Sequence, residues 1–577
     1  MIQMKPSNML SRSSSLWNIV FLLTMLVYAS GLFVDIMEPD AAVYAEVSME
    51  MHDTGNYLSI YHKQIDWLDK PPFPFWMSAI SYSIFGVSTF AYKLPAVLFV
   101  LLGACYTFLF ARKFYSPLHG WLAALILITA QHIIISNQDV RAEPFMTGLV
   151  IMALYHLAIL VQNRQQENGP PAWPHAVLGA LALAGLMMTK GLFTIIPVGA
   201  GIGLTLIYKR QWRRIFDPAW LMVATAVILF LFPALYGYYQ QFDLHPEKEV
   251  FGRHGVSGVE FFLWTSQWGR FTNTGPIKGS GDPTFFVHTL LWAFLPWSFA
   301  AFYGLFRKTK ALIKRTGGGE HYTYFGFITL FLIFSASKFQ LSFYLNPLFP
   351  LLAIITTAAL LQNGIRPLKA FARIHTVLGI LLLLALVALH YFFLATLPHS
   401  DTIVIVLACA ALALYLYFGR IAYLKKILFA MALVALAVNY YLNRDFYPAL
   451  LQYQAESQAA HFIKKNGIPA GQVVFVGDVQ SVADIILHHV TPIIAPDSVS
   501  VNALAGRYVF TSPEGQKKID SLGLKYSVIT QFADFPVTRL TGKFINRKTR
   551  WQEVQTKLLL KTADGVTLVP SVDAASR

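Results

Sequence analysis

Carboxylates and cations that could act together are concentrated in a few polar stretches of an otherwise apolar chain. The first stretch, at 38–76, reads EPDAAVYAEVSMEM…IDWLDKPPFPFW and follows a long apolar segment directly; it contains Asp40, Tyr44, Glu46, Asp69 and Lys70. Charge held beside a bilayer is costly to keep without a use. We therefore expect chemistry in this loop.

Later polar stretches repeat the pairing of acid and cation. They are NQDVRAEPFM with Asp139, Arg141 and Glu143, TKGLF with Lys190, EFFLWTSQWGRF with Arg270, and ASKFQLSFYLNPLFP with Lys338 and Tyr344. Lysines at the outer ends of membrane spans run against the usual trend and indicate an anionic ligand, with snorkelling as the alternative. The acids alone have simpler explanations, because they solvate loops and favour helix N-termini.

The combination suits attack by an acceptor oxygen on a group activated by a lipid phosphate. A carboxylate near the attacking hydroxyl accepts its proton. Lysine or arginine stabilises the departing phosphate, and arginine can bind it through two parallel hydrogen bonds. Because phosphate leaves as a stable anion, this chemistry requires no general acid.

The composition indicates which elements must position these residues. Hydrophobic residues make up 55% of the 577 residues and charged residues only 13%, about half the charged share of soluble domains. The mean hydropathy of +0.51 agrees with a polytopic membrane protein. Both cysteines lie in apolar runs, which argues against a disulfide framework.

About thirteen apolar runs approach the ~20 residues that a bilayer crossing needs. They lie near 16–35, 92–111, 118–137, 144–163, 175–189, 192–208, 218–238, 285–306, 322–336, 345–362, 374–396, 402–418 and 427–442. We interpret the first as an uncleaved signal anchor, since no small-residue cleavage site clearly follows it.

Charge asymmetry predicts the orientation of these runs. With a cytoplasmic N-terminus, the even-numbered connections carry RK (112–113), Arg164, KRQWRR (209–214), RKTKALIKR (307–315), RPLKAFAR (366–373) and RIAYLKK (420–426) on one side. That is the pattern of a cytoplasmic face, and it explains the net charge of +15 better than nucleic-acid binding does. An odd number of crossings then places the C-terminal part outside.

The apolar segment at 72–86 is short, and counting it as a crossing would invert the alternation of the later basic loops. We therefore predict a juxtamembrane helix there. The transmembrane domain then covers 1–442, with extracytoplasmic loops at 36–91, 137–143, 239–284 and 337–344. From 443 to 577 short strand and helix patterns alternate, which predicts an extracytoplasmic α/β domain.

Several motifs together resemble the bacterial GT-C membrane glycosyltransferases, the superfamily of protein O-mannosyltransferases and of the aminoarabinose transferase that modifies lipid A. The motifs are Tyr-Ala-Glu, acid-Lys-Pro-Pro, Phe-Gly-Val, VRAEPF, TKG, FFLW…GRF, FLPWS and SKFQLSFYLNPLFP, spread over residues 16–365. The resemblance implies a GT-C fold and inverting transfer of a sugar from a polyprenyl-phosphate donor to an envelope lipid, glycan or protein. It also implies a bacterial inner membrane as the location.

The resemblance carries roles to individual positions. Asp40 matches the catalytic aspartate, the proposed base, and Glu143 matches the second acidic position, so both are expected to be catalytic. Asp69 and Lys70 match the acid-Lys pair near the donor phosphate, and Arg270, Lys338 and Tyr344 match positions that line the donor cavity. The residues expected to bind donor phosphate and substrate are therefore Tyr44, Asp69, Lys70, Asp139, Arg141, Lys190, Arg270, Lys338 and Tyr344.

Two positions depart from the family. The usual Asp-Glu pair is Asp40-Ala41 here, and Gln267 stands where the aminoarabinose transferase has a metal-holding histidine, so a metal would be left with Asp69 and Gln267. We expect no required cofactor and do not assign aminoarabinose as the sugar. One alternative is a transporter or flippase of lipid-linked saccharides, which would place ionisable residues near the bilayer midplane. A second alternative is an oligosaccharide ligase or polymerase.

Overall fold

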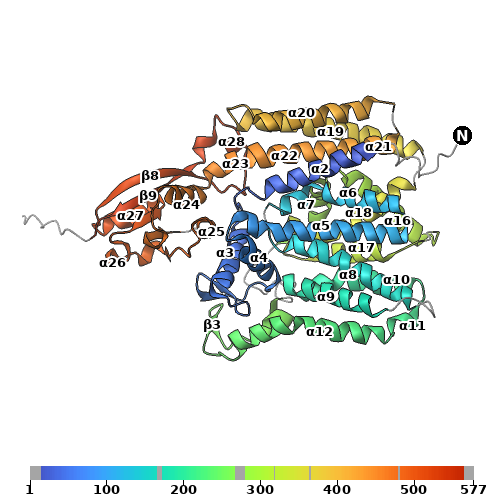
Figure 1. Cartoon of the computed structure of the whole chain (residues 1–577), viewed down its shortest axis with the longest axis horizontal. Helices are drawn as coiled ribbons and strands as arrows, with labels where there is room; N and C mark the ends of the chain where they lie inside the picture. The colour runs from blue at the N-terminus through green and yellow to red at the C-terminus, as the bar shows by residue number, and fades with distance from the viewer. Residues whose placement is uncertain are drawn as a thin grey trace, which may run out of the picture.

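The fold has two parts, a long helical bundle and a smaller sheet-bearing part at one end of it (Figure 1). The structure is a computed structural model, and it describes residues 14–138, 140–164, 172–266, 280–316, 319–362, 365–420, 422–477 and 481–564. The first described helix begins at the end of the bundle that lies opposite the sheet (Figure 1).

The bundle is built from helices in the same order as the predicted apolar runs. Its α-helices are α2 (Ser14–Gly31), α5 (Thr89–Phe114), α6 (Pro117–Ile128), α7 (Gln131–Ser136), α8 (Glu143–Asn163), α9 (Trp173–Lys190), α10 (Ile196–Tyr208), α11 (Trp212–Ile215), α12 (Ala219–Tyr238), α15 (Phe285–Ala293), α16 (Ser298–Ile313), α17 (Tyr322–Ala336), α18 (Phe349–Leu361), α19 (Ile365–Phe393), α20 (Ser400–Phe418), α21 (Tyr423–Lys425) and α22 (Met431–Tyr441). Short 3₁₀ or π segments adjoin several of them, among them η1 (Leu192–Ile195), η4 (Ser342–Leu348) and η5 (Lys426–Ala430).

Each of the thirteen apolar runs coincides with helix. Within the described residues, seven helices are long and apolar enough to cross a membrane, and four shorter ones are also apolar. A polytopic helical fold is therefore confirmed, while the number of thirteen crossings stays a prediction. Prolines stand in the first turn of α6, α8, α9, α10 and α18, where the missing N–H has no helical partner to lose.

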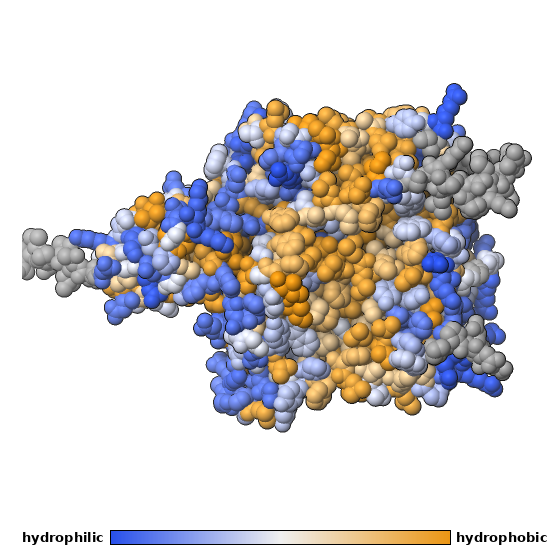
Figure 2. All heavy atoms as spheres, viewed as in Figure 1, coloured by the Kyte–Doolittle hydropathy of each residue, from blue (hydrophilic) through white to orange (hydrophobic). Residues whose placement is uncertain are grey.

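Burial separates inner helices from outer ones. α8 is buried on nearly all sides, whereas α19 presents Val377, Leu381 and Leu384 to the outside on one face. Exposed apolar side chains at that spacing are expected of a helix that faces lipid. Figure 2 shows the result, an apolar surface over the middle of the bundle with hydrophilic residues gathered towards both ends.

Short elements cover the end of the bundle nearest the sheet. They are α3 (Pro39–Thr54), β1 (Tyr61–His62), β2 (Ile65–Asp66), α4 (Phe73–Phe85), β3 (Glu249–Val250), β4 (Arg253–His254), α13 (Gly258–Glu260), and the π segments η2 (Tyr239–Asp243) and η3 (Phe261–Thr265). α4 has 13 residues, about 20 Å of helix, against ~30 Å of bilayer hydrocarbon. It packs beside α3 and α5, in the arrangement expected of a juxtamembrane helix.

The C-terminal part contains one five-stranded sheet in the order β6-β5-β7-β9-β8. Strand β5 (Val473–Val476) pairs in parallel with β6 (Ile493–Ile494) and β7 (Tyr508–Thr511), while β9 (Gln555–Thr562) pairs antiparallel with β7 and with β8 (Tyr526–Asp534). The accompanying helices are α24 (Ala455–Lys465), α25 (Val482–Leu487), α26 (Val501–Leu504), α27 (Pro513–Ser521) and α28 (Gly542–Ile545), with the 3₁₀ segments η8 (Ala470–Gln472), η9 (Pro496–Ser498) and η10 (Arg550–Gln552).

Two features of this part differ from the sequence pattern. The composition changes at 443, but the helix continues past it through η6 (Leu442–Phe446), α23 (Tyr447–Leu450) and η7 (Leu451–Tyr453), so the sheet-bearing part begins at α24. Strand β9 was not predicted, although it lies between β7 and β8. Its sequence, QTKLLLKT, has three leucines in a row instead of the alternation that marks a half-buried strand.

Candidate functional site

A cavity of about 70 Å³ opens at the end of the bundle next to α3 and the C-terminal part. Its walls come mainly from the first loop, from the end of α9, and from the stretch that runs from the end of α17 towards α18. The lining residues are Asp69, Lys70, Pro71, Lys190, Phe193, Ser266, Ile333, Phe334, Ser337, Phe339 and Tyr344. Two lysines thus line a wall that is otherwise largely apolar. A smaller adjoining cavity shares Lys190, Phe193, Phe334 and Tyr344 and continues towards Met146 and Leu330.

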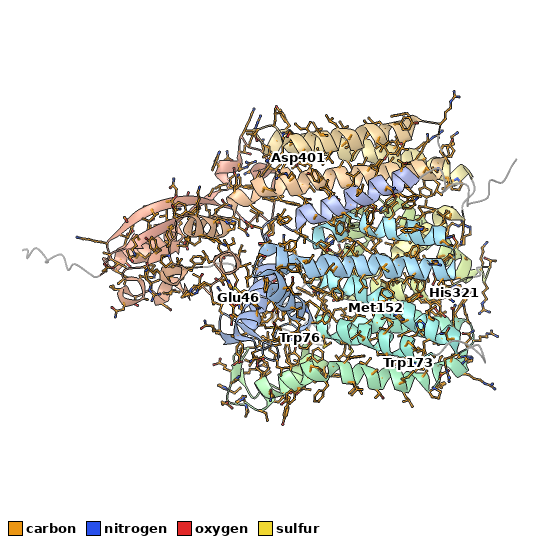
Figure 3. The ribbon with its side chains drawn as sticks, viewed as in Figure 1. Glu46, Trp76, Met152, Trp173, His321 and Asp401 are labelled. Carbon is orange, nitrogen blue, oxygen red and sulfur yellow. The ribbon has the colours of Figure 1, made fainter. Side chains whose placement is uncertain are left out.

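A buried ion pair joins two helices of the bundle at this cavity. Glu143, the first residue of α8, accepts a hydrogen bond from Lys190, the last residue of α9. Their side chains are 2% and 6% exposed, so each charge depends on the other. The Lys190 ammonium also lies 4.3 Å from the ring centre of Tyr344. Figure 3 labels Trp173, the start of α9, at the far end of the bundle, which places Lys190 at the end nearest α3.

A second ion pair connects the start of α3 to the same side chains. Arg141 pairs with Glu38, the residue that precedes α3, and its guanidinium lies 4.2 Å from the ring centre of Phe343. Lys190 lies 5.2 Å from the same ring. The first turn of α3 is therefore connected to the cavity through Glu38, Arg141 and Phe343.

Asp40 lies in that first turn and is exposed. No hydrogen bond or ion pair of its carboxylate is recorded with any residue that the structure describes. The N-terminus of a helix favours a negative charge. Asp40 is thus an accessible carboxylate, and among the described residues it has no hydrogen bond or ion pair to break before it accepts a proton.

Asp69 and Lys70 form an ion pair on the cavity wall. The aromatic residues before and after them hold this segment in place, with the Trp67 ring 5.8 Å from Phe75 and 6.4 Å from Tyr44. Tyr44 itself is buried between α3 and α4, with its ring 5.1 Å from that of Phe75. Tyr44 therefore packs beneath the cavity wall and does not line the cavity.

The remaining predicted residues are less closely placed. Lys338 is exposed, and only its neighbours Ser337 and Phe339 line the cavity. Asp139, Arg270 and Gln267 lie outside the described residues. Within the described ranges no three His, Cys, Asp or Glu side chains are grouped as a metal site, and Asp69 is already paired with Lys70. The expectation that no metal or other cofactor is required stays a prediction.

Sequence reasoning missed several residues that shape the site. Glu38, Phe343 and Phe193 carry no motif signal of their own, because an acid before a helix and aromatic residues at a membrane surface are common. Glu46 carried a signal that went unused. It lies four residues before Glu50, and two acids at that spacing on one buried face repel each other unless one is neutral.

Part of the chain matches a known protein family. Residues 69–236 match the family model described as dolichyl-phosphate-mannose-protein mannosyltransferase. That match begins at the Asp69-Lys70 pair and includes Glu143 and Lys190.

Two curated relatives extend the similarity. The chain is 28% identical over 385 residues to an undecaprenyl phosphate-alpha-4-amino-4-deoxy-L-arabinose arabinosyl transferase 2 of Pseudomonas fluorescens, which covers 64% of each chain. It is 26% identical over 437 residues to an uncharacterized protein of Aquifex aeolicus, covering 74% of this chain and 77% of the relative. The chain thus matches a little under two thirds of the length of the first of these relatives.

The fold is also shared with a solved structure, ArnT from Cupriavidus metallidurans bound to undecaprenyl phosphate. The TM-score is 0.71 at 19% identity, covering 94% of this chain and 97% of that one. Sequence similarity and fold together show a polytopic membrane protein of the GT-C type. These comparisons confirm the resemblance seen in the motifs: the chain is similar to the GT-C glycosyltransferases, the superfamily that contains the protein mannosyltransferases and the aminoarabinose transferases.

Proposed function

We propose that the chain is an inverting glycosyltransferase that moves a sugar from a polyprenyl-phosphate donor to a lipid A-type acceptor at the outer face of a bacterial inner membrane. The observation that carries the proposal is the cavity in which Lys70 and Lys190 meet an apolar wall at one end of the bundle. A lipid phosphate needs this combination, because its head group is an anion and its chain is hydrocarbon. The names of the curated relatives support the same donor class.

In the proposed reaction the donor phosphate occupies the cavity between Lys70 and Lys190. The acceptor hydroxyl attacks the anomeric carbon from the face opposite the phosphate, so one C–O bond forms while the sugar–phosphate C–O bond breaks. The hydroxyl proton passes to the Asp40 carboxylate. The polyprenyl phosphate leaves with the bonding electron pair, and the two ammonium groups stabilise its added charge.

Asp40 suits the role of base better than Glu143 does. A general base must be able to reach the proton it removes, and Asp40 is exposed while the Glu143 side chain is 2% exposed and paired with Lys190. Glu143 then has a different role. It keeps Lys190 charged and oriented at the cavity, so we regard it as a positioning residue for the phosphate contact.

The test is transfer by the purified full chain in nanodiscs, with a radiolabelled polyprenyl-phosphate sugar and lipid A as substrates. We expect Asp40→Asn to reduce kcat by about a hundredfold or more, the share that general base catalysis commonly supplies, with donor binding preserved. The matched control is Glu249→Gln, which neutralises an exposed acid on β3 and should transfer as the natural protein does.

Full activity of Asp40→Asn would disprove its assignment as the base. Movement of the labelled donor across the membrane without transfer to any acceptor would instead support the transporter alternative. Comparison of donors that carry different sugars in the same assay identifies the sugar.

A further inference from the structure

Two carboxyl groups on α3 are buried together on the side away from the cavity. Glu46 is 0% exposed and Glu50 is 7% exposed, and their carboxyl groups are within hydrogen-bonding reach of each other. Within the described residues, Glu46 Oε2 has no donor, and the nearest cation-forming group is His62, with Nε2 at 3.7 Å. Two buried carboxylates in contact cannot both be ionised, so one proton must lie between them.

The surroundings decide which acid keeps the proton. Burial, followed by the contact with Glu50, raises the pKa of Glu46 to about 10. The other groups facing the pair do not reverse this, because burial lowers the pKa of His62 and the Lys63 ammonium is paired with Asp484. The raised pKa favours the protonated form of Glu46, whose hydroxyl can donate to Glu50.

Both acids bind the same backbone turn. Lys63 and Gln64 connect β1 to β2 with φ values of 55° and 62°, a conformation that residues with a Cβ rarely adopt. The Lys63 N–H donates to Glu46 Oε1 at 3.1 Å, and the Gln64 N–H donates to Glu50 Oε1 at 3.0 Å. The turn is thus held by carboxyl groups in a conformation that its own residues disfavour.

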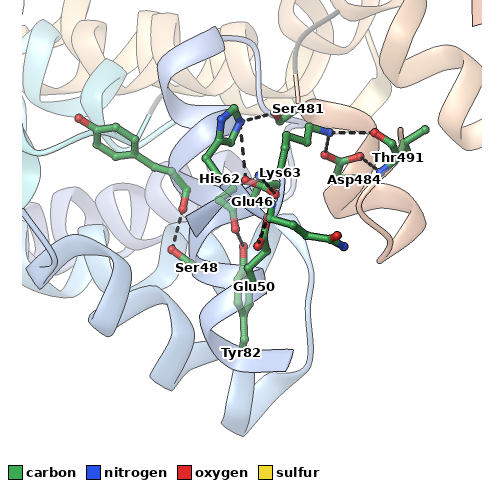
Figure 4. A network of polar contacts seen from close by, with 12 residues as sticks. Glu46, Ser48, Glu50, His62, Lys63, Tyr82, Ser481, Asp484 and Thr491 are labelled. Atoms are coloured by element: carbon green, nitrogen blue, oxygen red, sulfur yellow. Dashed lines mark hydrogen bonds and ion pairs between the residues drawn. The ribbon is translucent and has the colours of Figure 1, made fainter. Parts of the chain in front are cut away.

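The C-terminal part holds the same turn from the opposite side (Figure 4). The Lys63 ammonium pairs with Asp484 of α25, and Asp484 Oδ1 also accepts the N–H of Thr491 at 2.9 Å. His62 Nε2 lies 3.1 Å from Ser481 Oγ. The turn is therefore enclosed between α3, which carries Asp40 at its other end, and the C-terminal part.

The chain that leaves this turn leads directly to the cavity. β2 ends at Asp66, the Trp67 N–H donates to the Ile60 carbonyl at 3.0 Å, and Asp69 and Lys70 follow on the cavity wall. We propose that Glu46 is a positioning residue for sugar transfer. As a neutral hydrogen-bonding group it holds the Lys63–Gln64 turn together with Glu50. Through β2, the turn keeps the Asp69-Lys70 pair at the donor phosphate. This inference rests on the proposed function and extends it to a residue that does not touch substrate.

The deciding variants are Glu46→Gln and Glu46→Ala, studied in the full chain in nanodiscs. The amide of Glu46→Gln is neutral, can accept from the Lys63 N–H and can donate to Glu50, so donor KM and kcat should remain within about twofold of the natural protein. Glu46→Ala removes both bonds, and donor KM should rise about tenfold while kcat changes less, as expected for the loss of one or two buried hydrogen bonds.

Two further measurements keep this test separate from the proposed function. Amide hydrogen exchange over 61–70 should accelerate in Glu46→Ala and not in Glu46→Gln. The dissociation constant for polyprenyl phosphate should rise in Glu46→Ala and not in Glu46→Gln, whether or not any sugar is transferred. Ser48→Ala is the control, because Ser48 is a buried polar residue of α3 whose hydroxyl donates to the Tyr44 carbonyl within the same helix.

Loss of activity in Glu46→Gln equal to that in Glu46→Ala would overturn the inference, because an ionised carboxylate would then be required. Unchanged exchange over 61–70 and unchanged phosphate affinity in Glu46→Ala would overturn it as well, because the turn would not depend on Glu46. Binding of polyprenyl phosphate by the natural protein without transfer would contradict the proposed function alone.

Discussion

The Glu143–Lys190 ion pair allows a quantitative prediction about stability. Both side chains are almost fully buried, and each single change to Met leaves the partner as an uncompensated buried charge. Breaking a buried pair from one side costs about 3–5 kcal/mol, whereas replacing both partners with apolar residues of similar volume is often close to neutral. We therefore expect Glu143→Met and Lys190→Met each to lower the free energy of unfolding by about 3–5 kcal/mol. The double variant should lie within about 2 kcal/mol of the natural protein.

The assay is a double-mutant cycle with reversible unfolding in mixed micelles. It is combined with polyprenyl-phosphate binding. Lys190→Met should weaken phosphate affinity most, and Glu143→Met should weaken it less, because Lys190 then keeps its ammonium group but loses the partner that orients it. The exposed pair of Lys518 and Asp497 is the control, and Lys518→Met should leave stability unchanged within error. Additive effects of the two buried changes would refute the reasoning, since they would mean that neither charge depends on the other.

Three further predictions concern the first loop and the C-terminal part. Lys70→Ala should weaken polyprenyl-phosphate binding by about tenfold or more, and a change confined to acceptor KM would contradict its contact with phosphate. The His461 ring donates from Nε2 to the Asp35 carboxylate at 2.7 Å, and this hydrogen bond raises the pKa of His461 above its ordinary 6.5. The bond therefore stabilises docking of the C-terminal part below pH 6.5, and the stabilisation is lost as pH rises through the raised pKa. Protection of the α24 amides, which is their exchange relative to the intrinsic rate at each pH, should therefore fall as pH rises above 6.5 through the raised pKa. His461→Gln should remove that fall, and an identical pH profile of protection in the variant would contradict the prediction. Arg550 is buried and donates to the Phe393 carbonyl at 2.8 Å. Arg550→Ala should therefore lower the free energy of unfolding of the C-terminal part by about 2–4 kcal/mol in chemical denaturation, and an unchanged denaturation midpoint would argue against the contact.

The helical architecture was largely predictable because a bilayer imposes a simple rule on the sequence. Long apolar runs must form helices there, since no water satisfies the backbone polar groups. Each predicted run therefore coincides with helix. The C-terminal sheet was predicted less completely, because β9 pairs with strands far from it in sequence and lacks alternation.

The candidate site was predictable as a set of residue types and only partly as a set of contacts. An acid-Lys pair before Pro-Pro and a lysine at the outer end of a span can be recognised in the amino-acid sequence, and both lie on the cavity wall. The sequence did not predict that Lys190 pairs with Glu143, because the two residues lie on different helices, 47 positions apart. Nor did it show that Tyr44 packs beneath the wall.

The sequence by itself determined the class of protein, the end of the bundle at which charge gathers, and the loop that begins with Asp40. Those properties depend on composition and on motifs of adjacent residues. The tertiary structure decided which charged side chains are available to a substrate, because that depends on the partners that distant segments of the chain bring to each side chain. Asp40 stays exposed at the start of α3, while Glu46, six residues later on the same helix, is buried against Glu50 and holds the turn that leads to Lys70.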